Sequence, residues 1–262
     1  YPLALFLYAT FELPKYLWRR MIHGRYRGLF RQRLGFLPRE VAECGVDLPI
    51  WIHAVSVGEA QVARSLVAQL TERHPNRRIV ISTITDTGQE IAKNIPNVSA
   101  IFYLPLDFGW CVRKAIGLIH PSLVVLIENE IWPTLTGELS KQGIPIVMVN
   151  GRVSDESYPK YRRIARFLRP IFDRVGAFLV QTPRDAERFA EIGAPKERIE
   201  VLGSLKFDVT QVGERPDLRK KWRAELKISE DTILIVAGST YPGEEEILVP
   251  VLAEISPKRT VR

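Results

Sequence analysis

A carboxylate stands where an apolar run of this sequence gives way to a helical pattern. Glu59 follows the run IWIHAV at 50–55, together with Ser56 and Gly58. A carboxylate at such a turn can act as a general base toward a bound substrate. It can also simply begin a helix, where the helix dipole favours a negative charge. Both interpretations of Glu59 stay open from the residues alone.

Other polar side chains follow later apolar runs in the same way. They are Thr85 and Thr87 after 78–83, Glu128 and Glu130 at the end of 123–128, Arg152 after 145–149, and Lys206 after 199–203. In open parallel sheets, ligands bind beyond the carboxyl ends of the strands, so these residues predict one site at one edge. Structural alternatives stay open: an N-cap for the threonines, an ion pair with the arginine for the acids, and solvent exposure for the lysine.

Short apolar runs alternate with helical patterns from residue 50 onward. The predicted strands are 50–55, 78–83, 99–104, 123–128, 145–149, 176–180 and 199–203, and the predicted helices lie near 59–73, 87–94, 109–118, 133–142, 157–172 and 184–192. Runs with little strict alternation indicate strands that are buried on both faces, which is typical of parallel sheets. The order predicts an α/β fold with a Rossmann-like, doubly wound sheet.

The sequence predicts a second domain after a polar segment. A strand at 232–237 (TILIVA) and a helix near 243–255 form one βα unit, which cannot bury its own faces. The predicted organisation is therefore an N-terminal segment at 1–40, a Rossmann-like domain at 41–210, a linker at 211–231, and the incomplete beginning of a second domain at 232–262.

Composition narrows the class of function. The 262 residues are 46% hydrophobic and 26% charged, which is ordinary for a protein with a buried core. Two cysteines cannot build a disulfide framework, and the four histidines are scattered, so no metal site is predicted. The glycine turns lack both GxGxxG and GxxxxGK[ST], which argues against a dinucleotide or P-loop site.

The N-terminal segment combines aromatic residues with cations. Seven Lys and Arg side chains lie between Lys15 and Arg33 without an acid among them, after the apolar opening YPLALFLYATFELPKYLW. Glu12 and Pro14 interrupt that opening, which falls short of the ~20 residues of a spanning helix. The pattern favours a helix anchored at an anionic leaflet over a helix packed on the domain. No nucleic-acid motif accompanies the net charge of +7.

Seven stretches together resemble one known family. HAVSVGE, STITDTGQE, YLPLDF, IENEIWP, NGRVSDESY, LGSLKFD and GSTYPGEEE occur in the order and at the spacing of the 3-deoxy-D-manno-oct-2-ulosonic acid (Kdo) transferases. The resemblance implies a glycosyltransferase-B architecture and an inverting, metal-independent transfer of Kdo from CMP-Kdo to the lipid A precursor, with no cofactor. It places the protein at the cytoplasmic face of the inner membrane, in contact with an anionic membrane surface.

The resemblance also implies residue roles. Glu59 matches the catalytic base, and Glu128 and Lys206 match residues that stabilise the transition state; the family often reads ETE where this chain reads ENE. Ser56, Gly58, Thr85, Thr87, Glu130 and Arg152 are the predicted acceptor-binding residues. Ser239, Thr240 and Glu244 are the predicted donor-binding residues.

Three questions stay open at this stage. A helix N-terminus should lower the pKa of Glu59, whereas burial or the neighbouring Glu128 should raise it. The alternative functions are a catalytically silent, membrane-docked acceptor-binding fragment and a glycosyltransferase-B that uses another nucleotide sugar. The arginines and lysine at 152–169 either face acceptor phosphates or headgroups, or form a solvated helix face.

Overall fold

The structure is a computed structural model that describes residues 27–205, 216–229, 232, 234–238, 240–241 and 243–255. The predicted membrane-associated segment lies outside these residues as far as residue 26, and so do Lys206 and Ser239. The chain divides into two compact units, Tyr1–Thr210 and Gln211–Arg262, and each is described by itself.

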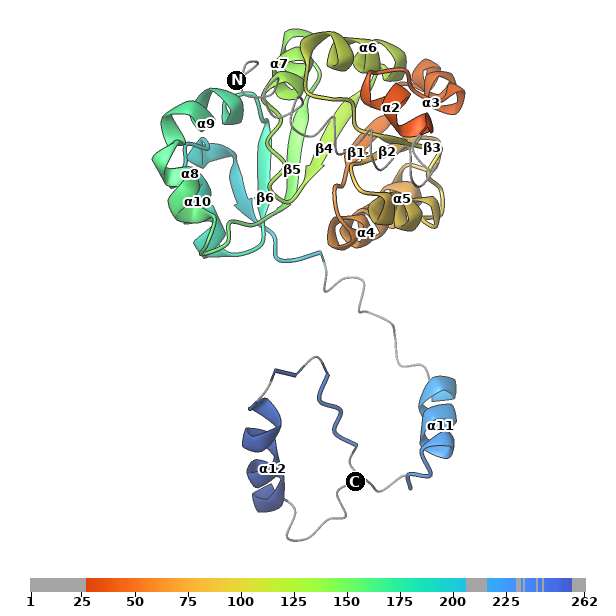
Figure 1. The fold of residues 1–262 in the computed structure, drawn as a ribbon, viewed down its shortest axis with the longest axis vertical. Helices are drawn as coiled ribbons and strands as arrows, with labels where there is room; N and C mark the ends of the chain where they lie inside the picture. Colours follow the sequence, from red (N-terminus) through yellow and green to blue (C-terminus); the bar gives the residue numbers. More distant parts are fainter. Residues whose placement is uncertain are drawn as a thin grey trace. The chain divides into compact units, whose positions relative to one another are not determined.

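A seven-stranded parallel sheet forms the centre of the first unit (Figure 1). Its strands are β1 (Ile50–His53), β2 (Ile79–Thr83), β3 (Ala100–Tyr103), β4 (Leu123–Ile127), β5 (Ile146–Gly151), β6 (Ala177–Val180) and β7 (Ile199–Val201). Their order across the sheet is β3-β2-β1-β4-β5-β6-β7. This is the doubly wound Rossmann-like order, extended by one strand, and it confirms the predicted fold class of this domain.

Helices cover both faces of the sheet. They are α2 (Arg27–Arg33), α3 (Arg39–Cys44), α4 (Val57–Arg73), α5 (Asp86–Lys93), α6 (Gly109–Ile119), α7 (Pro133–Lys141), α8 (Tyr158–Arg163), α9 (Ala165–Phe172) and α10 (Pro183–Glu191), with 3-10 turns η1 (Gly45–Asp47) and η2 (Lys196–Arg198). One apolar cluster joins the sheet to α4 and α5, and the other joins it to α3, α6, α7, α9 and α10.

Successive residues of a strand belong alternately to these two clusters. In β1, Trp51 belongs to the cluster under α6 and α7, whereas Ile50 and Ile52 belong to the cluster under α4. All four residues of β1 and all five of β2 are buried. Burial on both faces therefore explains why the strands read as continuous apolar runs in the sequence.

The predicted strands of the first unit are confirmed, with ends that differ by at most two residues. The helix expected at 157–172 is instead two helices, because Ile164 leaves the helical conformation at φ −109° and ψ 13°. Helix α8 buries no side chain, whereas α9 buries Leu168 and Phe172. The break lets α9 alone turn an apolar face toward the core.

Helix α2 packs on the edge of the sheet. The guanidinium of Arg33 donates to the carbonyl oxygens of Leu104 at 3.0 Å and Ile84 at 2.8 Å, and Gln32 Oε1 accepts from the Tyr103 N–H at 2.7 Å. Arg33 thus belongs to the domain packing, although the sequence placed it in a basic run that faces a membrane.

The second unit contains α11 (Pro216–Glu225) and α12 (Glu244–Ile255). The strand expected at 232–237 is wrong for the residues that are described there, Thr232 and 234–237, none of which forms a strand. A strand needs a hydrogen-bonded neighbour, and the described part of 211–262 holds no other strand to pair with it.

Candidate functional site

The candidate site lies where the strand order reverses. Strands β1 and β4 are neighbours in the sheet, and the chain leaves β1 toward one side and β4 toward the other. Such a switch point is the usual ligand position in an open α/β sheet. Ser56 and Glu59 follow β1 in the sequence, and Glu128 and Glu130 follow β4. We call these four residues the β1–β4 rim.

Glu59 lies in the first turn of α4 and caps it. Ser56 is the N-cap residue, whose Oγ accepts from the Glu59 N–H at 3.3 Å. In return, Glu59 Oε1 accepts from Ser56 Oγ at 2.9 Å, and Glu59 Oε2 accepts from the Val55 N–H at 2.7 Å. The side chain is only 7% exposed. The helix-start interpretation of Glu59 is therefore observed, as a reciprocal capping box.

The environment nevertheless raises the pKa of Glu59 above its ordinary value. Burial is the largest cause, because it penalises the charged carboxylate, and the negative charges of Glu130 and then Glu128 act in the same direction. The hydrogen bonds from Val55 and Ser56 lower the pKa but do not outweigh these effects. Of the two directions that the sequence left open for the pKa of Glu59, the structure therefore supports the increase, with burial as its main cause. Glu130 raises this pKa more than Glu128 does, although the sequence pointed to Glu128.

Glu128 stands in an unusual backbone conformation. Its φ is 61°, in the left-handed region, and Asn150 at the end of neighbouring β5 has a φ of 60°. Asn150 Nδ2 donates to Glu128 Oε1 at 3.3 Å, and the Asn150 Oδ1 accepts from the Leu205 N–H at 3.1 Å. A glutamate in this region costs about 1–2 kcal/mol, which the surrounding structure must offset. Such strain is typical of functional positions.

Glu130 is held by residues that the sequence did not point to. Trp132 Nε1 donates to Glu130 Oε2 at 2.8 Å, and the Nε2 atom of His53 lies 3.7 Å from the same oxygen. Trp132 is in turn the residue before α7, whose first N–H groups, those of Thr134 and Leu135, donate to the buried carboxylate of Asp107 at 2.9 and 2.8 Å. Asp107 thus fixes the start of the helix that follows Glu130.

Thr85 and Thr87 begin α5. Thr85 is its N-cap residue: its Oγ1 accepts from the Gly88 N–H at 3.1 Å and donates to the Val55 carbonyl at 3.0 Å. A Cβ at Gly88 would come within 3.0 Å of that carbonyl oxygen, so the close approach of the two turns requires glycine. The predicted N-cap role of Thr85 is observed, and it ties α5 to the turn that carries Ser56. Thr87 is exposed, with its Oγ1 3.4 Å from that of Thr85, and Gly58 lies in the first turn of α4.

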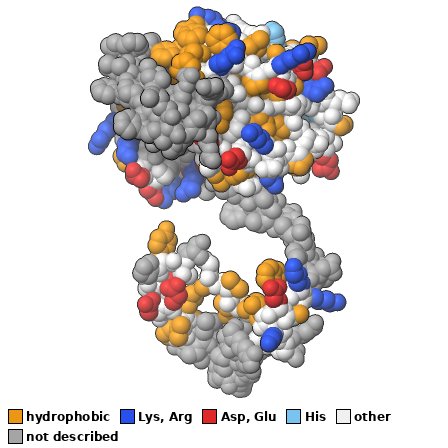
Figure 2. All heavy atoms as spheres, turned by 45° about the vertical axis from the view of Figure 1, so that its right-hand side comes forward, with side chains coloured by type: hydrophobic (Ala, Val, Ile, Leu, Met, Phe, Trp, Pro, Cys, Tyr) orange, Lys and Arg blue, Asp and Glu red, His pale blue; other side chains and the backbone are white. Residues whose placement is uncertain are grey.

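The cations predicted at 152–169 are exposed. They are Arg152, Lys160, Arg162, Arg163, Arg166 and Arg169. Lys160 pairs with Glu156 at 2.9 Å, and the charge of Arg152 acts on Asp155, whose pKa lies below its ordinary value chiefly because Arg188 donates to it. Between them, Phe167 is 75% and Ile164 is 43% exposed. Basic side chains occur at several separate places on the face shown in Figure 2.

The predicted donor-side residues lie in the second unit. Thr240 Oγ1 donates to Glu245, and Glu244 Oε2 accepts from the Tyr241 N–H at 3.0 Å at the start of α12. These contacts are local to the turn before the helix.

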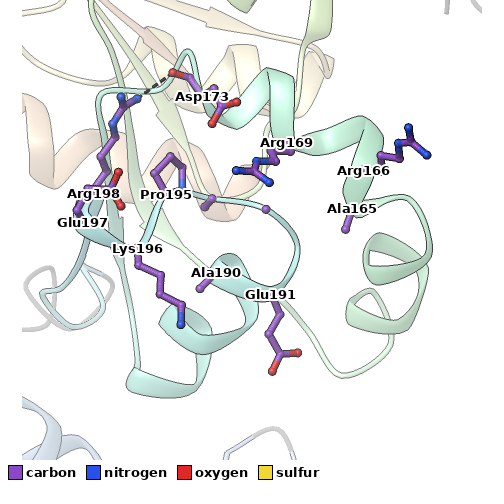
Figure 3. Close-up of a pocket in the computed structure, with 12 residues that line it drawn as sticks. Ala165, Arg166, Arg169, Asp173, Ala190, Glu191, Pro195, Lys196, Glu197 and Arg198 are labelled. Carbon is purple, nitrogen blue, oxygen red and sulfur yellow. Dashed lines mark hydrogen bonds between the residues drawn. The ribbon is translucent and has the colours of Figure 1, made fainter.

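A cleft of about 690 Å³ lies elsewhere in the first unit (Figure 3). It is bordered by α9, the end of α10 and η2, which lead into the amino ends of β6 and β7, so it lies at the opposite edge from the β1–β4 rim. Arg198 donates to the carbonyl oxygens of Asp173 at 2.8 Å and Val175 at 3.0 Å, which makes it a structural residue (Figure 3). Among the predicted catalytic and acceptor-binding residues that the structure describes in the first unit, none lines this cleft, whereas Arg166 and Arg169 of the basic cluster at 152–169 do.

Two features can be stated of the residues that the structure describes. No three His, Cys, Asp or Glu side chains among them are placed to hold a metal ion together. No helix among them has the length and apolar character needed to cross a membrane.

Comparison with known sequences finds one family. The sequence model of 3-deoxy-D-manno-octulosonic-acid transferases (kdotransferases) matches residues 29–209. A protein of Chlamydophila psittaci named 3-deoxy-D-manno-octulosonic acid transferase is 33% identical over 263 residues, which cover 97% of this chain and 60% of the relative. One of the same name from Haemophilus influenzae is 34% identical over 226 residues, which cover 86% and 52%. The chain thus spans 52–60% of the length of these two relatives.

Comparison with solved structures finds the same architecture in other enzymes. The UDP-GlcNAc 2-epimerases of Neisseria meningitidis and Methanocaldococcus jannaschii superpose with TM-scores of 0.56 and 0.52 at 11% and 13% identity. Each match covers 81% of this chain and 64% of the epimerase. At such low identity the likeness concerns the fold alone, and it confirms a glycosyltransferase-B-type domain.

Proposed function

The chain belongs to the 3-deoxy-D-manno-octulosonic-acid (Kdo) transferase family, and we propose that it carries the acceptor-binding part of an enzyme that transfers Kdo from CMP-Kdo to a lipid A precursor. The transfer inverts the anomeric centre, needs no metal ion and serves lipopolysaccharide biosynthesis. Glu59 is the general base. The resemblance of the seven motifs to the family supports these assignments.

The observation that carries the proposal is the environment of Glu59. Its carboxylate is 7% exposed and has a raised pKa, and it lies beside two further acids at the switch point of the sheet. A general base works best when its pKa lies near the operating pH, and an exposed glutamate is too acidic for that. Burial is the larger cause of this shift, and the neighbouring acids add to it in the same direction.

The proposed step balances without any further reactant. Glu59 accepts the proton of the acceptor hydroxyl while the hydroxyl oxygen bonds to the anomeric carbon of Kdo. The bond from that carbon to the phosphate oxygen of CMP breaks, and CMP leaves with the electron pair. Each carboxylate oxygen can accept more than one hydrogen bond, so the contacts of Glu59 with Ser56 and Val55 leave room for the acceptor hydroxyl.

Glu128 and Lys206 stabilise the transition state in this proposal. The strained backbone of Glu128 and its bond to Asn150 support a fixed carboxylate at the rim. Lys206 follows Leu205 in the sequence, and the Leu205 N–H donates a hydrogen bond to the side chain of the same Asn150. The residue before Lys206 is therefore fixed to the rim side of β5. A lysine can offset the negative charge that develops on the departing phosphate without a metal ion.

We assign the acceptor contacts to the turns around the rim. Hydroxyl and backbone groups come from Ser56, Gly58, Thr85 and Thr87, a carboxylate from Glu130 and a cation from Arg152. The exposed guanidinium of Arg152 suits a phosphate of the acceptor, because arginine can bind phosphate oxygens through two parallel hydrogen bonds. Ser239, Thr240 and Glu244 are the corresponding proposal for the CMP-Kdo side.

We further propose that the protein works at the cytoplasmic face of the inner membrane. The exposed Phe167 lies in α9 with Arg166 and Arg169, and an apolar side chain among cations suits the interface of an anionic leaflet. Each cation near such a surface contributes about 1 kcal/mol of attraction. The aromatic and basic N-terminal stretch provides the second attachment.

The test is transfer of Kdo by the full-length protein. CMP-Kdo generated in situ is supplied with vesicles that contain the tetraacylated lipid A precursor, and the lipid is weighed by mass spectrometry. We expect a mass gain of one or more Kdo units, which Glu59→Gln abolishes. Glu72→Gln, the same change at an exposed position of α4, should leave the mass gain intact.

The outcomes separate the alternatives. Binding to the vesicles without any mass gain would contradict the transferase and favour a silent acceptor-binding module. A mass gain only with a different nucleotide sugar would contradict the donor assignment. A full mass gain from Glu59→Gln would contradict Glu59 as the base.

A further inference from the structure

His53 is a fully buried polar side chain in an apolar strand. It is the last residue of β1, next to the rim, and its exposure is 0%. Its Nδ1 atom lies 2.8 Å from Ser82 Oγ and 3.1 Å from the Ser82 carbonyl oxygen on neighbouring β2. Its Nε2 atom is buried without any partner at hydrogen-bonding distance. An unpaired buried donor costs about 1–3 kcal/mol, so this orientation calls for a reason.

The contacts of His53 Nδ1 bear on which nitrogen carries the proton. Trp51 Nε1, which can only donate, lies 2.8 Å from Ser82 Oγ, so that hydroxyl accepts from Trp51 and keeps its hydrogen and a second lone pair. If the hydroxyl donates to Nδ1 at 2.8 Å, a neutral imidazole carries its proton at Nε2. The Ser82 carbonyl oxygen, 3.1 Å from Nδ1, can only accept and favours the opposite tautomer.

The Nε2 atom of His53 faces Glu130. The distance from Nε2 to Glu130 Oε2 is 3.7 Å, which is an electrostatic contact and too long for a hydrogen bond. The indole of Trp132 donates to the same oxygen at 2.8 Å and meets the imidazole edge-on, with ring centroids 5.8 Å apart. With the imidazole proton at Nε2, two N–H groups, one from β1 and one from the loop before α7, converge on one carboxylate oxygen.

We propose that His53 carries its proton at Nε2 and is a positioning residue that, together with Trp132, holds the Glu130 carboxylate in place so that its negative charge acts on Glu59. The inference rests on the proposed function only in taking Glu59 as the base. The relay runs from Trp51 through Ser82 to His53, and from His53 to Glu130. No atom of His53 needs to touch a substrate.

The electrostatics of Glu59 agree with this relay. After burial, the charge of Glu130 is the strongest influence that raises the pKa of Glu59, ahead of Glu128. The other acid at the turn packed against α4 is Asp86 of α5, which accepts a hydrogen bond from Tyr103 Oη at 2.7 Å. Without the Nε2–H of His53, the Glu130 carboxylate is held by Trp132 alone and can turn away from Glu59. A more distant negative charge lowers the proton affinity of Glu59.

The test follows the titration of Glu59 directly. In the full-length protein, ¹³C-labelled glutamate carboxyl groups are titrated by NMR, and Glu59→Gln identifies the resonance of Glu59. Two variants of His53 form a matched pair. The amide nitrogen of His53→Gln reaches the position of Nε2, whereas that of His53→Asn reaches only the position of Nδ1.

We expect the titration midpoint of Glu59 to move to lower pH in His53→Asn and in Glu130→Gln, and to stay near the wild-type value in His53→Gln. Adding His53→Asn to Glu130→Gln should produce no further movement, because the relay ends at Glu130. An unchanged midpoint in His53→Asn, or an equal movement in the Glu130→Gln background, would overturn the proposal.

The tautomer of His53 gives a second measurement that needs no variant. The ¹⁵N chemical shifts of the wild-type imidazole should show a proton on Nε2 and none on Nδ1, and the opposite tautomer would overturn the relay even if the His53 variants fail to fold. Neither measurement depends on Kdo transfer. A protein that titrates as expected without transferring Kdo would contradict the proposed function and leave the positioning role intact.

Discussion

Two helix starts in the first unit are built alike. At α4, Ser56 accepts from the Glu59 N–H at 3.3 Å and donates to the Glu59 carboxylate, which also accepts from the Val55 N–H. At α10, Thr182 and Asp185 repeat the arrangement, with 3.1 Å for the corresponding backbone bond and 2.9 Å from the Val153 N–H to the carboxylate. Both acids are buried, at 7% and 5% exposure.

The two acids differ in their neighbours. Glu59 follows β1 at the switch point and faces the charges of Glu130 and Glu128, whereas Asp185 follows β6, away from that point. Capping a helix and serving as a base are therefore compatible roles for one side chain. The surroundings of the cap, and not its hydrogen bonds, distinguish a candidate catalytic acid from a structural one.

The largest expected effect separates these two acids in catalysis. Glu59→Gln should reduce Kdo transfer by about 10²- to 10⁴-fold, the usual loss when a general base is removed. Asp185→Asn removes the same charge from the same kind of cap and should leave transfer by the folded protein unchanged. Initial rates, corrected for the folded fraction from circular dichroism, measure both. Equal losses would show that a cap at either helix start is what transfer requires.

A third helix start near the rim sharpens the comparison. Helix α7 has no side-chain cap of its own and relies on Asp107, which lies 26 residues before the first helical residue, Pro133. Asp107→Ala should lower the free energy of unfolding by about 2–3 kcal/mol, because two buried N–H groups lose their acceptor. Urea unfolding measures this. Asp107→Asn keeps one acceptor oxygen and should cost less; an equal cost would argue against the caps as the cause.

A smaller effect compares the hydroxyl caps of α4 and α10. Ser56→Ala and Thr182→Ala should each cost about 1 kcal/mol in urea unfolding, because each helix loses an N-cap acceptor. Only Ser56→Ala should raise the pKa of Glu59 further, since the Ser56 hydroxyl bond lowers it. Carboxyl ¹³C titration reports that pKa. A rise in Thr182→Ala as well would indicate a general loosening of the domain.

Most of the fold could be predicted because its signals are local. Strands such as IWIH and IVIST are buried on both faces, so each reads as an apolar run without reference to the rest of the chain. The same pattern failed at 232–237, where an apolar run has no neighbouring strand among the described residues. An apolar run states a preference for burial, whereas a strand also needs a partner.

The acids of the site could be predicted because strand ends mark one edge of the sheet. The residues that hold them could not, since their contacts join distant parts of the sequence: His53 meets Ser82 across 29 positions, and Asn150 meets Leu205 across 55. The sequence does carry one signal for such supporting residues, which is a polar residue inside an apolar run, as with His53 and Ser82. Such a residue must find a buried partner, and only the fold names it.

The smallest expected effect is the pH dependence that Glu59 gives to stability. Its pKa in the folded protein is raised above the ordinary value of 4.5, so the folded state binds the proton more tightly than the unfolded chain does. This contribution to the free energy of unfolding is present below pH 4.5 and is lost as pH rises through the folded-state pKa. Relative to Glu59→Gln, the wild type should therefore lose stability over that window.

Glu138 is the control of opposite sign, because its hydrogen bond from Lys141 lowers its pKa. Relative to Glu138→Gln, the wild type should lose stability as pH falls below 4.5. Urea unfolding between pH 3 and 8 measures both, and parallel curves for the two pairs would show that Glu59 and Glu138 titrate alike, which contradicts the acidic surroundings of Glu59.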